Sequence, residues 1–179
     1  MAGLRREHAS READMLRTLM SSPEPQPTPE MSLDADQLIL IVVGAHPRAE
    51  QSDRPVAYRL RERVLSWLDA QPEDELDFRR QPLVLTDLWY LNDESLHLAP
   101  VIAIGEPEVN AATARLARHL PTAFIVEQAF RVQLDPEYID LKACVWGDRP
   151  SATVSGVDLL VERYLDSFLR SAHELPIDE

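Results

Sequence analysis

The chain has 179 residues, 45% of them hydrophobic, which is enough for one domain with a hydrophobic core. Its 18 Lys and Arg residues against 31 Asp and Glu residues give a net charge of −13, which repels phosphate backbones and argues against nucleic-acid binding. Cys144 has no second cysteine to pair with, and the sequence shows neither a signal peptide nor an apolar stretch of membrane length. We therefore expect an acidic cytoplasmic protein that makes no contact with a membrane.

Residues 1–20 combine scattered apolar side chains with charged ones and contain no proline, which favours a helix. The apolar stripe of this helix is narrow, so the segment is either a frayed, solvated tail or a helix that docks onto a protein partner or a second copy of the chain. Proline then occupies every second position from Pro23 to Pro29, and this spacing predicts an extended linker over residues 21–32. An α/β domain over residues 33–175 and a tail over residues 176–179 complete the expected organisation.

The predicted domain opens with a continuous apolar run at residues 38–44, typical of a strand buried on both faces of a sheet. A helical pattern follows from Pro55 to Ala70, with its apolar side chains on one face. Residues 83–90 predict a second strand, whose direction the sequence leaves open, and residues 100–105 predict a third. The nine residues between them are too few for a full crossover helix, so we expect one compressed turn of helix around residues 93–97.

The second half of the domain continues the alternation of helices and strands. Residues 108–120 predict a helix, residues 123–134 a hairpin that turns near Gln128 and Ala129, and residues 141–147 a last strand. A broad apolar stripe then predicts a C-terminal helix that extends to about Ala172. This order predicts the α/β class, with a mostly parallel or mixed central sheet flanked by helices.

Three of the predicted strands end on a glycine that is soon followed by charged residues and proline: Gly44, Gly105 and Gly147. If these strands are parallel, their loops meet at one edge of the sheet, where open α/β sheets bind ligands. This edge would offer a titratable histidine, arginines that could hold an anion, and several carboxylates. The candidate ligand-binding residues are His46, Arg48, Asp93, Glu106, Asn110, Asp148 and Arg149. The alternative is that these residues only end strands and cap helices.

The sequence lacks the phosphate-binding loop, the dinucleotide-binding turn, the nucleophile elbow and the zinc-binding helix motif. Its five histidines are scattered, so we expect no metal site and no cofactor. Cys144 lies within an apolar run, which favours a buried and inert thiol over a nucleophile. Lysine occurs once, at Lys142, while arginine supplies every other basic residue, and we interpret this as a coding bias.

Residues 104–110, a strand that ends in glycine and is followed by proline, valine and asparagine before a helix, resemble a module of archaeal surface-layer proteins. Residues 144–147, which lead into a long helix, are similar to the closing strand and helix of that module. The resemblance covers residues 100–170 and implies a structural or binding role rather than catalysis.

Three functions remain open from the sequence. The first is a non-catalytic interaction or scaffold module, which the lack of catalytic motifs favours. The second is a binder of a small anionic ligand at the carboxyl edge of the sheet, held by Arg48 and Arg149. The third is a hydrolase or transferase that uses His46 with a carboxylate of that edge, which would be Asp93, Glu106 or Asp148.

Overall fold

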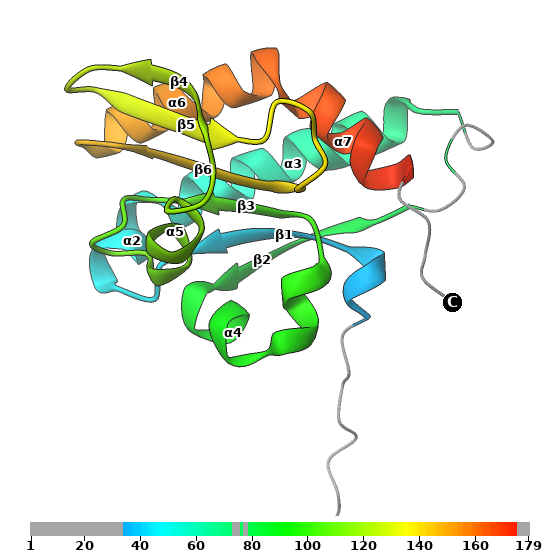
Figure 1. Ribbon diagram of the computed structural model, residues 1–179, viewed down its shortest axis with the longest axis horizontal. Helices are drawn as coiled ribbons and strands as arrows, with labels where there is room; N and C mark the ends of the chain where they lie inside the picture. The colour runs from blue at the N-terminus through cyan, green and yellow to red at the C-terminus, as the bar shows by residue number, and fades with distance from the viewer. Residues whose placement is uncertain (1–33, 73–75, 77–78, 175–179) are drawn as a thin grey trace, which may run out of the picture. The chain divides into compact units, whose positions relative to one another are not determined.

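A computed structural model describes residues 34–72, 76 and 79–174 (Figure 1). The predicted N-terminal helix, the proline-rich linker and the C-terminal tail lie outside these residues. The described part of the chain forms one six-stranded sheet with helices on both faces. The strands are β1 (Leu38–Val43), β2 (Gln81–Thr86), β3 (Val101–Ile104), β4 (Thr122–Val126), β5 (Phe130–Leu134) and β6 (Lys142–Gly147).

The strand order of the sheet is β2-β1-β3-β6-β5-β4. The first four strands in this order are parallel, whereas β5 and β4 run antiparallel to β6 and to each other. Val43 at the end of β1 pairs with Thr86 of β2 and with Ile104 of β3, so the parallel strands end at the same edge. The predicted α/β fold with a mixed sheet is confirmed.

Two long helices, α3 (Arg54–Ala70) and α6 (Pro150–Arg163), contact each other on one face of the sheet (Figure 1). Their apolar side chains bury the inward residues of β1, β3 and β6, so the main core lies between this helix pair and the sheet. The short helices α4 (Asp87–Asn92) and α5 (Ala111–Leu116) contact each other and cover the parallel strands on the opposite face. The remaining elements are α2 (Pro47–Ser52), α7 (Leu165–Glu174) and the 3-10 turns η1 (Ala35–Gln37) and η2 (Glu94–Leu98).

Most predicted elements are present, with three differences in extent. The strand expected over residues 83–90 ends at Thr86, whose hydroxyl caps α4 by accepting a hydrogen bond from the Trp89 backbone N–H at 3.4 Å. The helix expected over residues 108–120 is only α5, because Asn110 caps its start. The C-terminal helix breaks at Tyr164 into α6 and α7.

The predicted hairpin is confirmed as β4 and β5. Gln128 takes the positive backbone angle of its turn, with φ of 57°, where a glycine would be usual. Within the described part of the chain, no helix is long and apolar enough to cross a membrane.

Candidate functional site

The carboxyl edge of the four parallel strands brings together the three glycine-terminated loops of the sequence. Gly44, Gly105 and Gly147 all lie at this edge, and Asp87 follows β2 there. The chain passes from β1 to β2 on one side of β1 and then to β3 on the other side. Such a reversal of strand order is the usual position of a ligand crevice in an open α/β sheet.

Asn110 occupies this crevice and uses its whole side-chain amide within the protein. Its Nδ2 donates to the carbonyl oxygens of Val42 at 3.1 Å and Ile104 at 2.8 Å, which joins the ends of β1 and β3. Its Oδ1 accepts from the backbone N–H groups of Ala112 and Thr113 at the start of α5. Asn110 is completely buried, so this predicted ligand-binding residue instead ties the sheet to α5.

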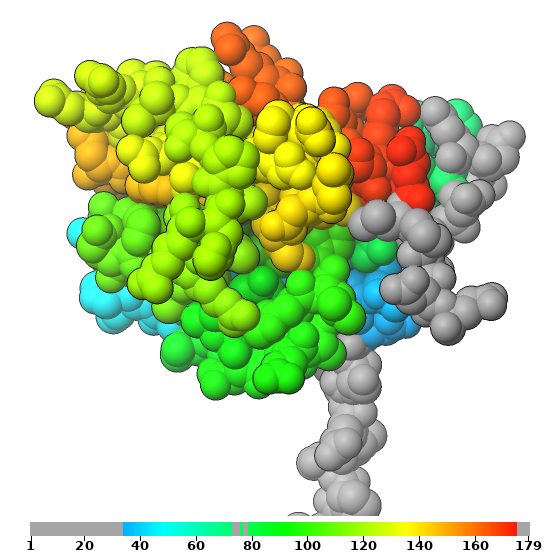
Figure 2. Space-filling model, in the orientation of Figure 1, coloured from blue at the N-terminus to red at the C-terminus, as the bar shows by residue number. Residues whose placement is uncertain are grey.

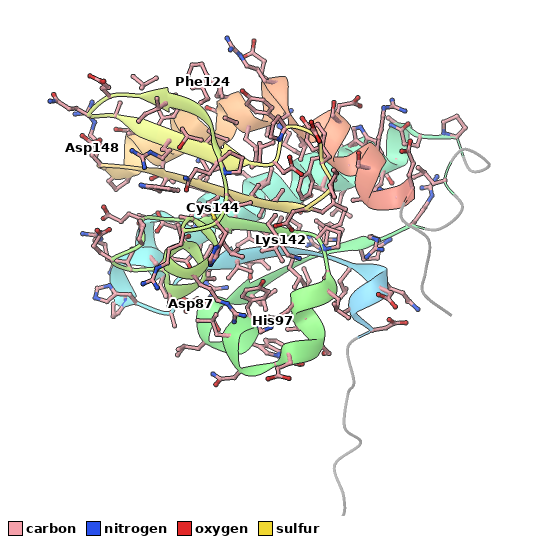
Figure 3. The ribbon with its side chains drawn as sticks, in the orientation of Figure 1. Asp87, His97, Phe124, Lys142, Cys144 and Asp148 are labelled. Carbon is pink, nitrogen blue, oxygen red and sulfur yellow. The ribbon has the colours of Figure 1, made fainter. Side chains whose placement is uncertain are left out.

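Asp87 closes the same crevice from the end of β2. Its Oδ1 accepts hydrogen bonds from the backbone N–H groups of Ala45 and Leu88, both at 2.8 Å. Its Oδ2 accepts from the backbone N–H of Ala111 at 2.7 Å. Only 4% of Asp87 is exposed, and its carboxylate therefore links the β1 loop, α4 and α5 (Figure 3). No sequence pattern pointed to Asp87, because this residue falls inside the strand predicted over residues 83–90.

The loop that follows β3 fills the rest of the crevice. The backbone oxygen of Val109 lies so close to Gly44 that a Cβ on this glycine would stand 1.8 Å from it. Only glycine allows the two chain segments to approach this closely. The crevice between β1 and β3 is therefore occupied by the chain's own backbone and side chains.

A smaller cavity of about 120 Å³ remains at the carboxyl edge, between β3, β6 and the start of α6. It contains four of the predicted site residues, and the side chains of two of them, Arg48 and Glu106, form an ion pair. Asp148 and Arg149 are exposed at its mouth. This volume is well below the roughly 300 Å³ at which small-molecule sites begin.

Asp53 lines this cavity and is 5% exposed, although no sequence pattern pointed to it. Burial raises the pKa of its carboxyl group above the ordinary value, and the hydrogen bond from the Ser52 hydroxyl at 3.0 Å partly offsets this shift. Gly105 adopts φ of 109° beside it, and a Cβ there would lie 2.5 Å from Asp53 Oδ2. A buried carboxylate with a raised pKa is a frequent feature of functional sites. The cavity that Asp53 faces contains more acidic groups than arginines, so it does not favour an anionic ligand.

The other two predicted site residues do not join this cavity. His46 is exposed and caps α2, with its Nδ1 accepting a hydrogen bond from the Arg48 backbone N–H at 3.1 Å. Asp93 caps η2, which contacts η1 ahead of β1 and so belongs to the amino edge of the sheet. The expectation that Asp93 lies at the carboxyl edge was wrong, because α4 carries the chain away from that edge.

An open groove of about 320 Å³ lies on the hairpin side of the same edge. Its floor includes Ile125, Arg131 and Trp146, which are cross-strand neighbours on β4, β5 and β6. The guanidinium carbon of Arg131 lies 5.5 Å from the ring centroid of Trp146, a cation–π contact. No described helix covers this row, and Figure 2 shows the hairpin projecting past the neighbouring elements. The acidic side chains that line the groove are Glu106, Glu108 and Asp148.

The described residues contain no cluster of three or more His, Cys, Asp or Glu side chains that could hold a metal ion. Cys144 is fully buried within β6, and burial raises the pKa of its thiol to about 12. The prediction that Cys144 is buried within an apolar strand is confirmed.

Comparisons with family models, with curated proteins and with solved structures return no match to this chain. The resemblance of residues 100–170 to the surface-layer module therefore stays a prediction.

Proposed function

We propose that the domain is a non-catalytic interaction module that binds an extended, basic segment of a partner protein along the hairpin of β4 and β5. The observation that carries this proposal is the exposure of two branched aliphatic side chains on an edge strand, Ile125 at 47% and Val126 at 40%. Strand β4 forms the end of the sheet, so within the described part of the chain only one of the two edges of β4 is paired.

An edge strand offers a row of backbone N–H and C=O groups to which a further strand can be added. The other edge strand of this sheet, β2, is protected. It contains Pro82, which has no N–H to donate, and the Arg61 side chain donates to the Pro82 carbonyl oxygen at 3.3 Å. Strand β4 has no proline, and its apolar side chains would pack against those of an added strand.

The charge of the groove favours a basic partner. Glu106 is paired with Arg48, but the other two carboxylates, Glu108 and Asp148, still outnumber the one arginine of the groove. That arginine, Arg131, already lies against Trp146. The net charge of −13 on the whole chain would also attract a basic segment over a longer distance. Aliphatic stems of arginine or lysine side chains could pack on Trp146 and Ile125, while their charged ends meet the carboxylates.

A pair of synthetic peptides tests this function. One alternates valine with arginine, and the other alternates valine with glutamate. In amide NMR spectra of the full chain, we expect the arginine peptide to shift resonances of residues 122–131, and the glutamate peptide to leave them unchanged. Absence of binding, or equal binding of both peptides, would contradict the proposal.

Two matched variants locate the binding. Ile125→Thr keeps strand propensity but removes apolar surface, so it should lower the affinity for the arginine peptide at least fivefold. Ile139→Thr makes the same change at a position that is 78% exposed and does not line the groove, and it should have no effect. Equal effects of the two variants would show that the hairpin is not the contact surface.

The two alternative functions receive less support. Both need His46 or Arg149 to act on a ligand at the carboxyl edge, and the crevice there is filled by Asn110 and Asp87. The remaining cavity is small, and its three carboxylates outnumber its two arginines, which disfavours an anion.

A further inference from the structure

A separate cavity of about 280 Å³ lies between η2, α5 and the amino end of β6, and it shares no residue with the groove or with the carboxyl-edge cavity. Leu116 and Leu120 form part of its wall. Its polar lining consists of Tyr90, His97, Arg115, His119, Asp140 and Lys142. We call this space the Lys142 cavity.

Lys142 is the only lysine in the chain, and it is the first residue of β6. Its Nζ donates to the carbonyl oxygens of His97 at 2.9 Å and Ala99 at 2.5 Å (Figure 3). An ammonium group has three N–H donors, and these two carbonyls accept two of them. The two carbonyls accept from the compact ammonium of a lysine. The planar guanidinium of an arginine would direct its N–H groups differently.

Burial lowers the pKa of Lys142 to about 8, and the nearby charge of Arg80 acts in the same direction, while Asp140 opposes it. The side chain is therefore mostly cationic at neutral pH in a poorly solvated position. An anion that entered the cavity would interact strongly with such a cation.

The rest of the lining reinforces this charge. Arg115 on α5 adds a second cation at the exposed rim, and among the described residues the single carboxylate of the cavity is Asp140. His97 is held in place, because its Nε2 donates to the Tyr90 carbonyl oxygen at 2.9 Å and its ring packs edge-on against the Tyr90 ring. In a chain with 31 acidic and 18 basic residues, a cavity in which basic groups predominate is a marked local reversal of charge.

We propose that the Lys142 cavity binds a small organic anion that carries a carboxylate or a sulfate-like oxyanion. Lys142 and Arg115 contact the anionic group, and Leu116 and Leu120 contact the apolar part of the ligand. A volume near 300 Å³ is at the lower end of small-molecule sites, which suits a small metabolite rather than a nucleotide. This inference is independent of the proposed interaction with a basic partner.

The test is a titration of the full chain with sodium sulfate or sodium succinate at constant ionic strength, monitored by amide NMR. We expect saturable shifts for residues around the cavity, and the tighter of the two probes identifies the preferred anionic group. Arg115→Ala should weaken binding at least fivefold. Arg118→Ala removes a neighbouring exposed arginine that does not line the cavity, so it should change binding less than twofold.

A pH series isolates the lysine. With a pKa of about 8, the ammonium fraction of Lys142 falls roughly eightfold between pH 7.5 and pH 9. Sulfate keeps its charge over this range, so its affinity should fall by a similar factor. The same pH series on Lys142→Met is the control, because this variant keeps every other titratable or charged group near the cavity. These groups are Tyr90, His97, Arg115, His119, Asp140 and the nearby Arg80.

The Lys142→Met variant should bind weakly and show little pH dependence. If that variant does not fold, the Arg115→Ala and Arg118→Ala pair still decides the question. No saturable binding of either probe, or equal binding by these two arginine variants, would overturn the proposal.

Discussion

Asp87→Asn should strongly destabilise the fold, although the substitution changes the side-chain volume very little. The carboxylate accepts three backbone hydrogen bonds of 2.7–2.8 Å, from Ala45, Leu88 and Ala111. In asparagine one of the two oxygens becomes an NH₂ group, which cannot accept, so at least one buried N–H loses its partner. Loss of a charge-assisted hydrogen bond and of that partner together costs about 3 to 5 kcal/mol. The total free energy of unfolding of a typical domain is only about 5 to 15 kcal/mol.

Urea unfolding of the full chain at pH 7 measures this loss, and Asp135→Asn provides a matched control. Asp135 also accepts three backbone N–H groups, from Glu137, Ile139 and Asp140, and these hydrogen bonds hold its pKa below the ordinary value. It lies at the surface, where water can replace a lost hydrogen bond, so its variant should be far less destabilised. A change below about 0.5 kcal/mol in Asp87→Asn would refute the structural role of this carboxylate.

Three further substitutions probe the core and the crevice. Val157→Asp places a charge in the buried face of α6 and should cost several kcal/mol, seen as loss of cooperative unfolding in circular dichroism. Gly44→Ala forces the loop at Val109 away from β1 and should lower stability by about 1 to 3 kcal/mol in the same urea assay. His173 is buried, and burial lowers its pKa below the usual 6.5, so the stability due to its neutral ring is complete above pH 6.5 and is lost as the pH falls below it. The unfolding free energy of the natural chain should thus decrease more between pH 7.5 and pH 5 than that of His173→Gln, and equal decreases would contradict this assignment.

The order and type of the main elements could be predicted because their patterns are local. The apolar run at residues 38–44 and the helical spacing from Pro55 to Ala70 each predicted the element that is present. Predictions of extent were less accurate where a cap decides the boundary. Thr86 and Asn110 begin helices through hydrogen bonds to backbone N–H groups, and a hydrophobic pattern contains no sign of these bonds.

The candidate sites needed the tertiary structure for a different reason. The sequence placed the loops after Gly44, Gly105 and Gly147 at one edge, because parallel strands must end together. It could not show that Asn110 would turn inward and fill the crevice. That orientation depends on the carbonyl groups of Val42 and Ile104, which are 62 residues apart in the chain and lie on two neighbouring strands.

The sequence by itself determined the α/β class, the acidic charge and the solitary positions of Cys144 and Lys142, because composition and periodicity are properties of the chain alone. Only the tertiary structure decided that Lys142 stands among basic groups in a cavity. It also decided that Ile125 lies exposed on an edge strand, because exposure depends on which strand ends the sheet. Burial, pKa and surface chemistry arise from contacts between residues distant in sequence, and those contacts exist only once the sheet has formed.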